Sequence, residues 1–446
     1  MSFLSLTDAD REEMLAAIGV SSVEELFRDI PEGVRFRGDL ELEPALSEPE
    51  LVAHLEELAG RNVPAGRELS FLGAGIYDHY VPAAVNAILS RGEFLTAYTP
   101  YQAEMSQGML QAIFEYQTAI CELTGMDVSN ASGYDGTTVA ADATYMARHV
   151  TGRSRVVVTE ATNPQVRQVV KTYAPGFGLE VVEVPHRSGT TDPDEVAAAA
   201  QDAACVIFQQ PNFFGCLEPA PDLAAAASDA GALAVAHVDP VSLGVLEAPG
   251  NYGCALAIGE GQSAGNTPSF GGPHYGFLAC RSDYIRRMPG RIVGETTDTA
   301  GARGFVLTLA TREQHIRREK ATSNITTNQT LLALGGLVYL TWLGPQGLRE
   351  LGETCLALGD YAKKRLVEAG AELAFPEQTT FKEFAVRVGR AGREIVRAAR
   401  ERGVHPGYAL GRDYEGMDDC LLVAVTEKRT PADIDRLAEV LSEVAG

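Results

Sequence analysis

The chain is poor in several residue types, and each shortage excludes a class of protein. Among its 446 residues there are six lysines and one tryptophan, and 60 acidic residues face 37 basic ones, which gives a net charge of −23. A surface this acidic argues against nucleic acid or an anionic membrane as a main partner. Solubility alone is the simplest reason for the acidity.

Cysteine pairs and a targeting segment are also missing. The seven cysteines are scattered without a Cys-X-X-Cys pair, and several lie in apolar runs, such as Cys205 in AACVIFQQ. This predicts buried, reduced thiols in a reducing compartment. The opening MSFLSLTDADREEM is acidic and does not look like a signal peptide. No stretch approaches the length of a membrane span, so we expect a cytoplasmic protein without a membrane partner.

The middle of the chain alternates short apolar strands with helices. Strands are expected at 155–160, 179–185, 204–211, 232–239 and 254–260, with helices between them. Near-continuous apolar strands of this kind belong to a mostly parallel sheet that is covered on both faces. Right-handed crossovers then favour a doubly wound α/β sheet.

The two ends of the chain have other patterns. We expect an N-terminal helical segment at 1–90, the large α/β domain at 91–330 and a smaller C-terminal α+β domain at 331–446. This order suits the fold-type-I, aspartate aminotransferase-like architecture of enzymes that use pyridoxal phosphate (PLP). Architecture alone does not fix a function.

One loop raises the main question about chemistry. GEGQSAGNTPSFGGPHYGF (259–277) looks like the loop that holds the PLP aldehyde, and that chemistry needs a lysine for the Schiff base. The loop has none. Lys320 follows soonest, in a basic run with Arg312, Arg317 and Arg318, where it is either a desolvated lysine or part of a solvated or anion-facing helix.

Two other segments have the form of a cofactor site. ASGYDGTTVAADATYMA (131–147) places Ser132 and Gly133 at the start of a helix, where backbone N–H groups favour a phosphate. Asp135 puts a negative charge there, which favours an ordinary capped turn or a decayed site. Asp239 ends a strand and either pairs with a pyridinium nitrogen or caps the turn that follows. His237 beside it is typical of a core histidine.

A polar and aromatic loop, YTPYQAEMSQG (98–108), precedes a helix. Its candidate residues are Tyr98, Tyr101, Gln102 and Glu104. Such a loop suits a pocket wall or an interface, or else it is a capped helix start with exposed tyrosines.

Several motifs together resemble one family. They are SFLGAGIYDHYVPAAV (70–85), YTPYQAEMSQG (98–108), GEGQSAGNTPSFGGPHYGF (259–277), MPGRIVGET (288–296) and TREQHIRREKATSNI (311–325). The chain resembles, over nearly its whole length, the P-protein of the glycine cleavage system, in the form of the alpha chain (subunit 1) of the two-chain bacterial glycine decarboxylase.

The resemblance implies an answer to the missing lysine. The family's catalytic beta chain carries a His-Lys-Thr segment, and alignment on Gly-Gly-Pro at 271–273 puts Gly261, Gln262 and Ser263 in its place. Gln262 then occupies the Schiff-base position, and glutamine cannot form an imine. The resemblance thus implies that this chain binds no PLP and that its remaining cofactor-type residues are vestigial: Ser132, Gly133, Asp239, Gln262 and Ser263.

The resemblance also implies the function. The chain would be a subunit of an oxidoreductase, glycine dehydrogenase (aminomethyl-transferring, decarboxylating), inactive alone and assembled with beta chains as an α2β2 heterotetramer. PLP on the beta chain binds glycine, CO2 leaves, and the aminomethyl group passes to the lipoyl arm of H-protein. We expect Tyr98, Tyr101, Gln102 and Glu104 to face the shared cleft, and the basic run with Arg312 and Arg317 to face the cleft or a partner.

Two other functions stay open. The chain could be a purely structural partner of a PLP enzyme, or a stand-alone PLP lyase or aminotransferase that uses another lysine. The absence of a lysine from the loop at 259–277 argues against the stand-alone enzyme.

Overall fold

The computed structural model describes residues 5–64, 66–321 and 325–445, which form two units, Met1–Val63 and Pro64–Gly446. In the first unit, α1 (Asp8–Ile18) begins at a Thr7 capping box and ends at the left-handed Gly19, and α2 (Glu48–Ala59) begins at Ser47. None of the described residues of this unit is buried, so they form no core of their own.

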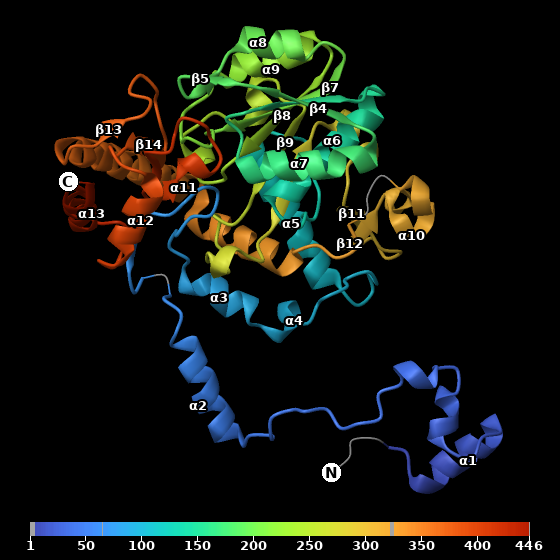
Figure 1. Ribbon diagram of the computed structural model, residues 1–446. Helices are drawn as coiled ribbons and strands as arrows, with labels where there is room; N and C mark the ends of the chain where they lie inside the picture. The colour runs from blue at the N-terminus through green and yellow to red at the C-terminus, as the bar shows by residue number, and fades with distance from the viewer. Residues whose placement is uncertain (1–4, 65, 322–324, 446) are drawn as a thin grey trace. The chain divides into compact units, whose positions relative to one another are not determined.

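The second unit is built on a seven-stranded sheet (Figure 1) with the strand order β2-β10-β9-β8-β7-β3-β4. Its parallel part consists of β9 (Leu256–Glu260), β8 (Leu233–Val238), β7 (Ala203–Gln210), β3 (Arg155–Thr159) and β4 (Glu180–Val184). At the other edge β10 (Gly276–Cys280) and β2 (Val128–Ser129) are antiparallel. The expected strands and their mostly parallel pairing are confirmed.

Both faces of this sheet are covered by helices. The buried cluster on one face includes side chains of α5 (Gln107–Thr124), α8 (Pro193–Ala199) and α9 (Ala220–Asp229). The cluster on the other face includes side chains of α6 (Gly136–Thr151) and α7 (Pro164–Phe177). This arrangement confirms the doubly wound α/β sheet.

A smaller α+β part closes the chain. Its four-stranded sheet has the order β13-β14-β17-β16, formed by Glu372–Leu373, Glu383–Arg387, Cys420–Ala424 and Tyr408–Ala409. It packs with α12 (Gly392–Arg400) and α13 (Pro431–Ala445) around a core that also takes in Phe71. The segment around residue 71 therefore packs with the C-terminal part, while the division at 90 and 330 stays a prediction.

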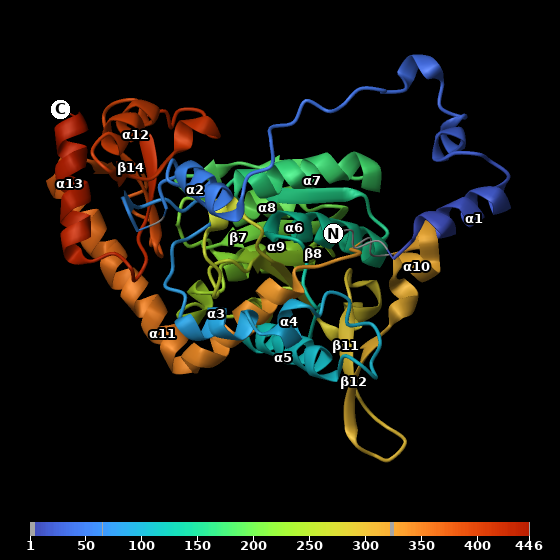
Figure 2. The same cartoon turned by 90° about the horizontal axis from the view of Figure 1, so that it is seen from below.

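The helix α11 (Thr330–Glu368) is long and apolar enough to cross a membrane by length and composition, so the expectation that no stretch approaches a span is wrong on that criterion. The helix is broken at Gly344, whose φ of 63° and ψ of 179° are not helical, ahead of Pro345. It packs on α3 (Ala83–Leu89), α5 and α13 (Figure 2). A kinked helix with partners on three sides is weak evidence for a span.

Candidate functional site

The candidate site lies where β7, β8 and β9 end and α6 begins, which is the edge of an open α/β sheet where ligands bind. We call it the sheet-end site. A cavity of about 60 Å³ remains there, lined among others by Gln209, His237, Asp239 and Glu260. The covering segment, residues 73–80, contributes Ala74 to Tyr77 to the same lining. The site therefore combines the start of the second unit with the central sheet.

In the loop at 259–277, Gln262 is fully buried. Its Nε2 donates to the backbone oxygens of Tyr77 (2.8 Å) and Asn266 (2.7 Å), and its Oε1 accepts from the N–H of Tyr77 (2.8 Å). Both amide donors are thus used. Gln262 fastens the covering segment to the loop instead of holding an aldehyde.

At the turn that begins α6, carboxyl groups accept hydrogen bonds from the backbone N–H groups that a phosphate would use. The Oδ1 atom of Asp135 accepts from the N–H groups of Thr137 and Thr138, each at 2.8 Å. Glu260 Oε2 accepts from the N–H of Gly136 at 2.9 Å. Burial raises the pKa of Glu260 to about 8, with Asp135 adding to the shift. The donors that would bind a phosphate are therefore already occupied.

Ser132 and Gly133 lie just before this turn. The buried Ser132 hydroxyl accepts from Asn328 Nδ2 at 2.8 Å. A Cβ on Gly133 would lie 2.2 Å from Val139 Cγ1, so the position has no room for a larger residue. Both residues thus serve the packing of the turn.

Asp239 is held from both sides. Its Oδ1 accepts from Ser263 Oγ at 2.6 Å and from the N–H of Val241 at 3.3 Å, and its Oδ2 forms an ion pair with Lys382 Nζ at 2.7 Å. Burial alone would raise the pKa of Asp239, but Lys382 and its other neighbours lower it below the ordinary value. Asp239 therefore caps the turn and also holds a cation.

Lys382 is the residue that sequence reasoning missed. It precedes β14 of the small sheet, yet its side chain is only 2% exposed and reaches Asp239. Its Nζ also lies 2.9 Å from His79 Nε2 and 3.5 Å from the centre of the Tyr77 ring. The available signal was a charged Lys-Glu pair inside the apolar stretch TTFKEFAVRV.

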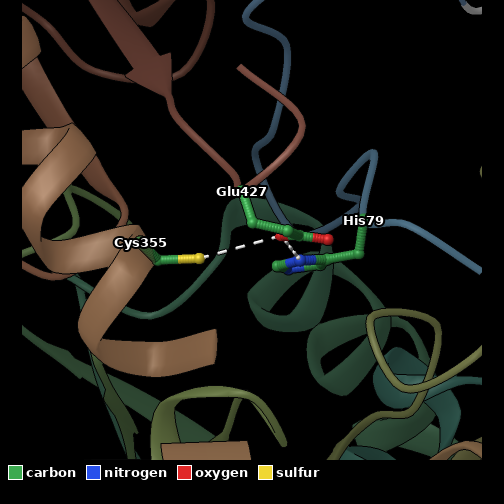
Figure 3. Close-up of side chains that lie close together, drawn as sticks. All are labelled: His79, Cys355 and Glu427. Atoms are coloured by element: carbon green, nitrogen blue, oxygen red, sulfur yellow. Dashed lines mark hydrogen bonds and ion pairs between the residues drawn. The ribbon is translucent and has the colours of Figure 1, made fainter. Parts of the chain in front are cut away.

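His79, Cys355 and Glu427 come together (Figure 3), with ligand-type atoms within 4.8 Å of one another. His79 brings this trio next to Lys382. His79 Nδ1 lies 2.7 Å from a Glu427 oxygen. A metal-bound histidine donates its second N–H to an acceptor, whereas here the second nitrogen faces the Lys382 ammonium. The trio therefore forms the end of a hydrogen-bonded chain, and its arrangement does not suit a metal.

These contacts test whether the residues present fit PLP. The loop at 259–277 has a buried glutamine and no lysine, the helix donors are taken by Asp135 and Glu260, and Asp239 is paired with Lys382. Each group that would recognise the cofactor is occupied by a side chain of this chain. The sheet-end site does not fit PLP.

The polar and aromatic loop lies on the surface. Tyr98 is 72% exposed, and its hydroxyl lies 3.2 Å from Thr327 Oγ1. The Tyr101 hydroxyl donates to the backbone oxygen of Thr326 (3.3 Å), and Arg291 lies over the Tyr101 ring at 4.3 Å. Gln102 and Glu104 are exposed as well. The loop is anchored at its tyrosines and open to a partner.

The basic run divides into two parts. Arg312 is buried and donates to the backbone oxygens of Met288 and Gly290, so the expectation that it faces a cleft or partner is corrected. Arg317, Arg318 and Lys320 are exposed. Arg312 instead holds together the loop that leads into the β11–β12 hairpin (Ile292–Thr297 and Arg303–Thr308).

The fold and the sheet-end site define the class: an α/β protein with fold-type-I PLP-enzyme architecture. Glutamate decarboxylase of Lactobacillus brevis shares the fold with a TM-score of 0.66 at 11% identity, over 92% of this chain and 95% of that one. A crystal structure of glycine decarboxylase (P-protein) in inhibitor-bound form matches with a TM-score of 0.91 and 43% identity over 100% of both chains.

The family model described as glycine cleavage system P-protein matches residues 1–441, and the chain belongs to this family. The probable glycine dehydrogenase (decarboxylating) subunit 1 of Carboxydothermus hydrogenoformans is 51% identical over 442 residues, which are 99% of each chain. Its counterpart in Anoxybacillus flavithermus is 48% identical over 99% of this chain and 98% of its own.

Proposed function

We propose that this chain is the lysine-free subunit of glycine decarboxylase, the P-protein of the glycine cleavage system. The observation that supports the proposal is the loop at 259–277, which has no lysine and in which the amide of the buried Gln262 is bound to Tyr77 and Asn266. Family membership over residues 1–441 supplies the reaction. The chain is then a component of an oxidoreductase and is inactive alone.

The cofactor belongs to a partner in this proposal. A beta chain would hold PLP, which would supply the electron sink for loss of CO2 from glycine, with the lipoyl group of H-protein as the acceptor of the aminomethyl group. An α2β2 assembly brings this chain to the partner's active site. The net charge of −23 and the buried thiols favour a cytoplasmic complex without nucleic acid.

The exposed loop at 98–108 favours a contribution to the shared site over a purely structural role. Tyr98 and Tyr101 are held by Thr326, Thr327 and Arg291, so their rings are positioned although they are exposed. Tyrosine is enriched at protein interfaces and among the residues that carry most of the binding energy there.

Reconstitution tests the assignment of the activity. Glycine-dependent CO2 exchange is measured with this chain alone, a beta chain alone and the mixture, each with PLP and lipoylated H-protein. We expect exchange only in the mixture, and a co-eluting complex of both chains. Exchange by this chain alone would contradict the proposal.

Substitutions in the loop at 98–108 distinguish a subunit that contributes to the shared active site from a purely structural partner. Tyr98→Phe and Glu104→Ala are expected to lower kcat/KM of the complex roughly tenfold or more, because each removes a polar group from the cleft. Tyr173→Phe, an exposed tyrosine on α7, serves as the control. Unchanged kinetics and assembly in both loop variants would favour the purely structural partner.

A further inference from the structure

We propose that Lys382 and Glu260 are internal ligands that close the sheet-end site to PLP, so that the site refuses the cofactor even when a lysine is restored at position 262. The proposal rests on the fold and on contacts within this chain. It can therefore fail while the proposed function stands, and the proposed function can fail while this inference stands.

Lys382 closes the end where the ring nitrogen would lie. In enzymes with this architecture a carboxylate beside the ring keeps the pyridine nitrogen protonated. Here the carboxylate is Asp239, and the Lys382 ammonium takes the place of that N–H at 2.7 Å. Its remaining sides face His79 at 2.9 Å and the Tyr77 ring at 3.5 Å. A cofactor would have to displace a fully paired, buried cation.

Glu260 closes the end where the phosphate would lie. Its two oxygens accept from the N–H of Gly136 at 2.9 Å and of Gln262 at 3.1 Å. Asp135 takes the next two N–H groups of α6 and leaves its negative charge at the helix start. A phosphate would find its donors occupied and would meet a carboxylate.

The cavity that Asp239 and Glu260 line is small. Its volume of about 60 Å³ suffices for a few water molecules. His237 borders this cavity and is buried, and neither of its ring nitrogens makes a hydrogen bond to the described residues. Burial lowers the pKa of His237 to about 4, so the ring is neutral at ordinary pH. Ordered water is the partner that such a site calls for.

The position of Lys382 also excludes it as a substitute Schiff-base lysine. Its ammonium lies against Asp239, at the ring-nitrogen end. The aldehyde of PLP is on the opposite side of the ring from that nitrogen. Lys382 therefore blocks the cofactor where it sits and cannot reach the carbon that a Schiff base requires.

The first test asks what must be removed before PLP binds. Two full-chain variants are titrated with PLP: the single variant Gln262→Lys and the triple variant Gln262→Lys/Lys382→Leu/Glu260→Thr. The adducts are then trapped with borohydride and mapped to their residues. We expect no adduct at position 262 in the single variant, and at least tenfold tighter binding with an adduct there in the triple variant. The control carries Gln262→Lys with Lys364→Leu and Glu353→Thr, two exposed positions.

Two results of this titration would overturn the proposal. One is that the single variant binds PLP as tightly as the triple variant. The other is that the triple variant, folded by circular dichroism, binds no more tightly than the single variant.

A second test does not depend on rebuilding the site. Lys382→Ala leaves Asp239 with a gap of the size of a small organic cation. Ethylammonium chloride should raise the melting temperature of this variant saturably by several degrees more than choline chloride does. The wild type and Lys382→Ala/Asp239→Asn should show no such difference. Equal effects on all three proteins would contradict the role of Lys382 as an internal cation.

Discussion

At the scale of single residues, the sheet-end site holds more carboxyl groups than cations. Asp239 and Glu427 have lowered pKa values because their bonds to Lys382 and His79 outweigh the effect of burial. Burial is the larger influence on Glu260 and Glu383, and it raises their pKa values to about 8 and about 7. Two buried carboxyl groups therefore retain protons at pH values where the unfolded chain has lost them.

This raised pKa predicts that stability falls with rising pH. Because the pKa of Glu260 lies above its ordinary 4.5, its contribution is complete below that pH and is lost as pH rises through about 8. A tenfold difference in proton affinity between the folded and unfolded chains changes the free energy of unfolding by about 1.4 kcal/mol. Glu260→Gln should flatten the loss of stability between pH 5.5 and 8.5, as measured by urea unfolding. An unchanged slope, equal to that of the exposed Glu353→Gln control, would contradict the protonation assigned to Glu260.

The assignment of Gln262 to the lysine position comes from the family resemblance and stays a prediction, and the partners of Gln262 could not be predicted from the sequence. The loop itself shows only that it contains no lysine. Lys382 and His79 are 303 residues apart in the sequence, and nothing local indicates that they meet. The burial of Arg312 could not be predicted either, because the sequence of a basic run does not show which of its side chains is buried.

At the scale of elements, the covering segment joins the large sheet to the small one. Gln262 binds the backbone of Tyr77, while Glu383 accepts from the N–H of Ala74 (2.7 Å) and from the Tyr77 hydroxyl (2.6 Å). Asp78 forms ion pairs with Lys428 and Arg429 after β17. The segment is thus tied to both sheets by buried bonds.

Tyr77→Phe should loosen this segment. The change leaves the buried Glu383 without its hydroxyl donor, which costs about 1–3 kcal/mol. Hydrogen exchange should become faster at residues 73–80 while the central strands stay protected. The control is Tyr361→Phe, which removes a similar bond to Asp435 on the surface and should leave the segment unchanged. Equal exchange in both variants would show that the hydroxyl bond does not hold the segment.

The elements themselves were largely predictable because their signals are local. Apolar runs bounded by turns mark β3, β4, β7, β8 and β9, and Asn163 with Pro164 marks the start of α7. The long α11 has no continuous local signal, since Gly344 and Pro345 interrupt the helical pattern that the helix continues through. Pairing within the small sheet depends on contacts between distant strands and carries no local signal.

At the scale of the whole molecule, the two units differ in how they are stabilised. Residues Pro64–Gly446 contain the buried clusters, whereas the described part of Met1–Val63 has none of its residues buried. Removal of residues 1–63 should therefore leave the melting temperature of the remainder within a few degrees of the full chain. Differential scanning calorimetry of the two chains checks this. Loss of the cooperative transition on truncation would show that the first unit supplies core packing.

In the proposed complex, this chain shapes an active site whose lysine lies in the partner. The most direct test is borohydride reduction of the assembled complex with PLP, followed by mass spectrometric mapping of both chains. We predict pyridoxyl label on one lysine of the partner and on none of the six lysines of this chain. Stoichiometric label on Lys382, Lys320 or any other lysine of this chain would contradict the account.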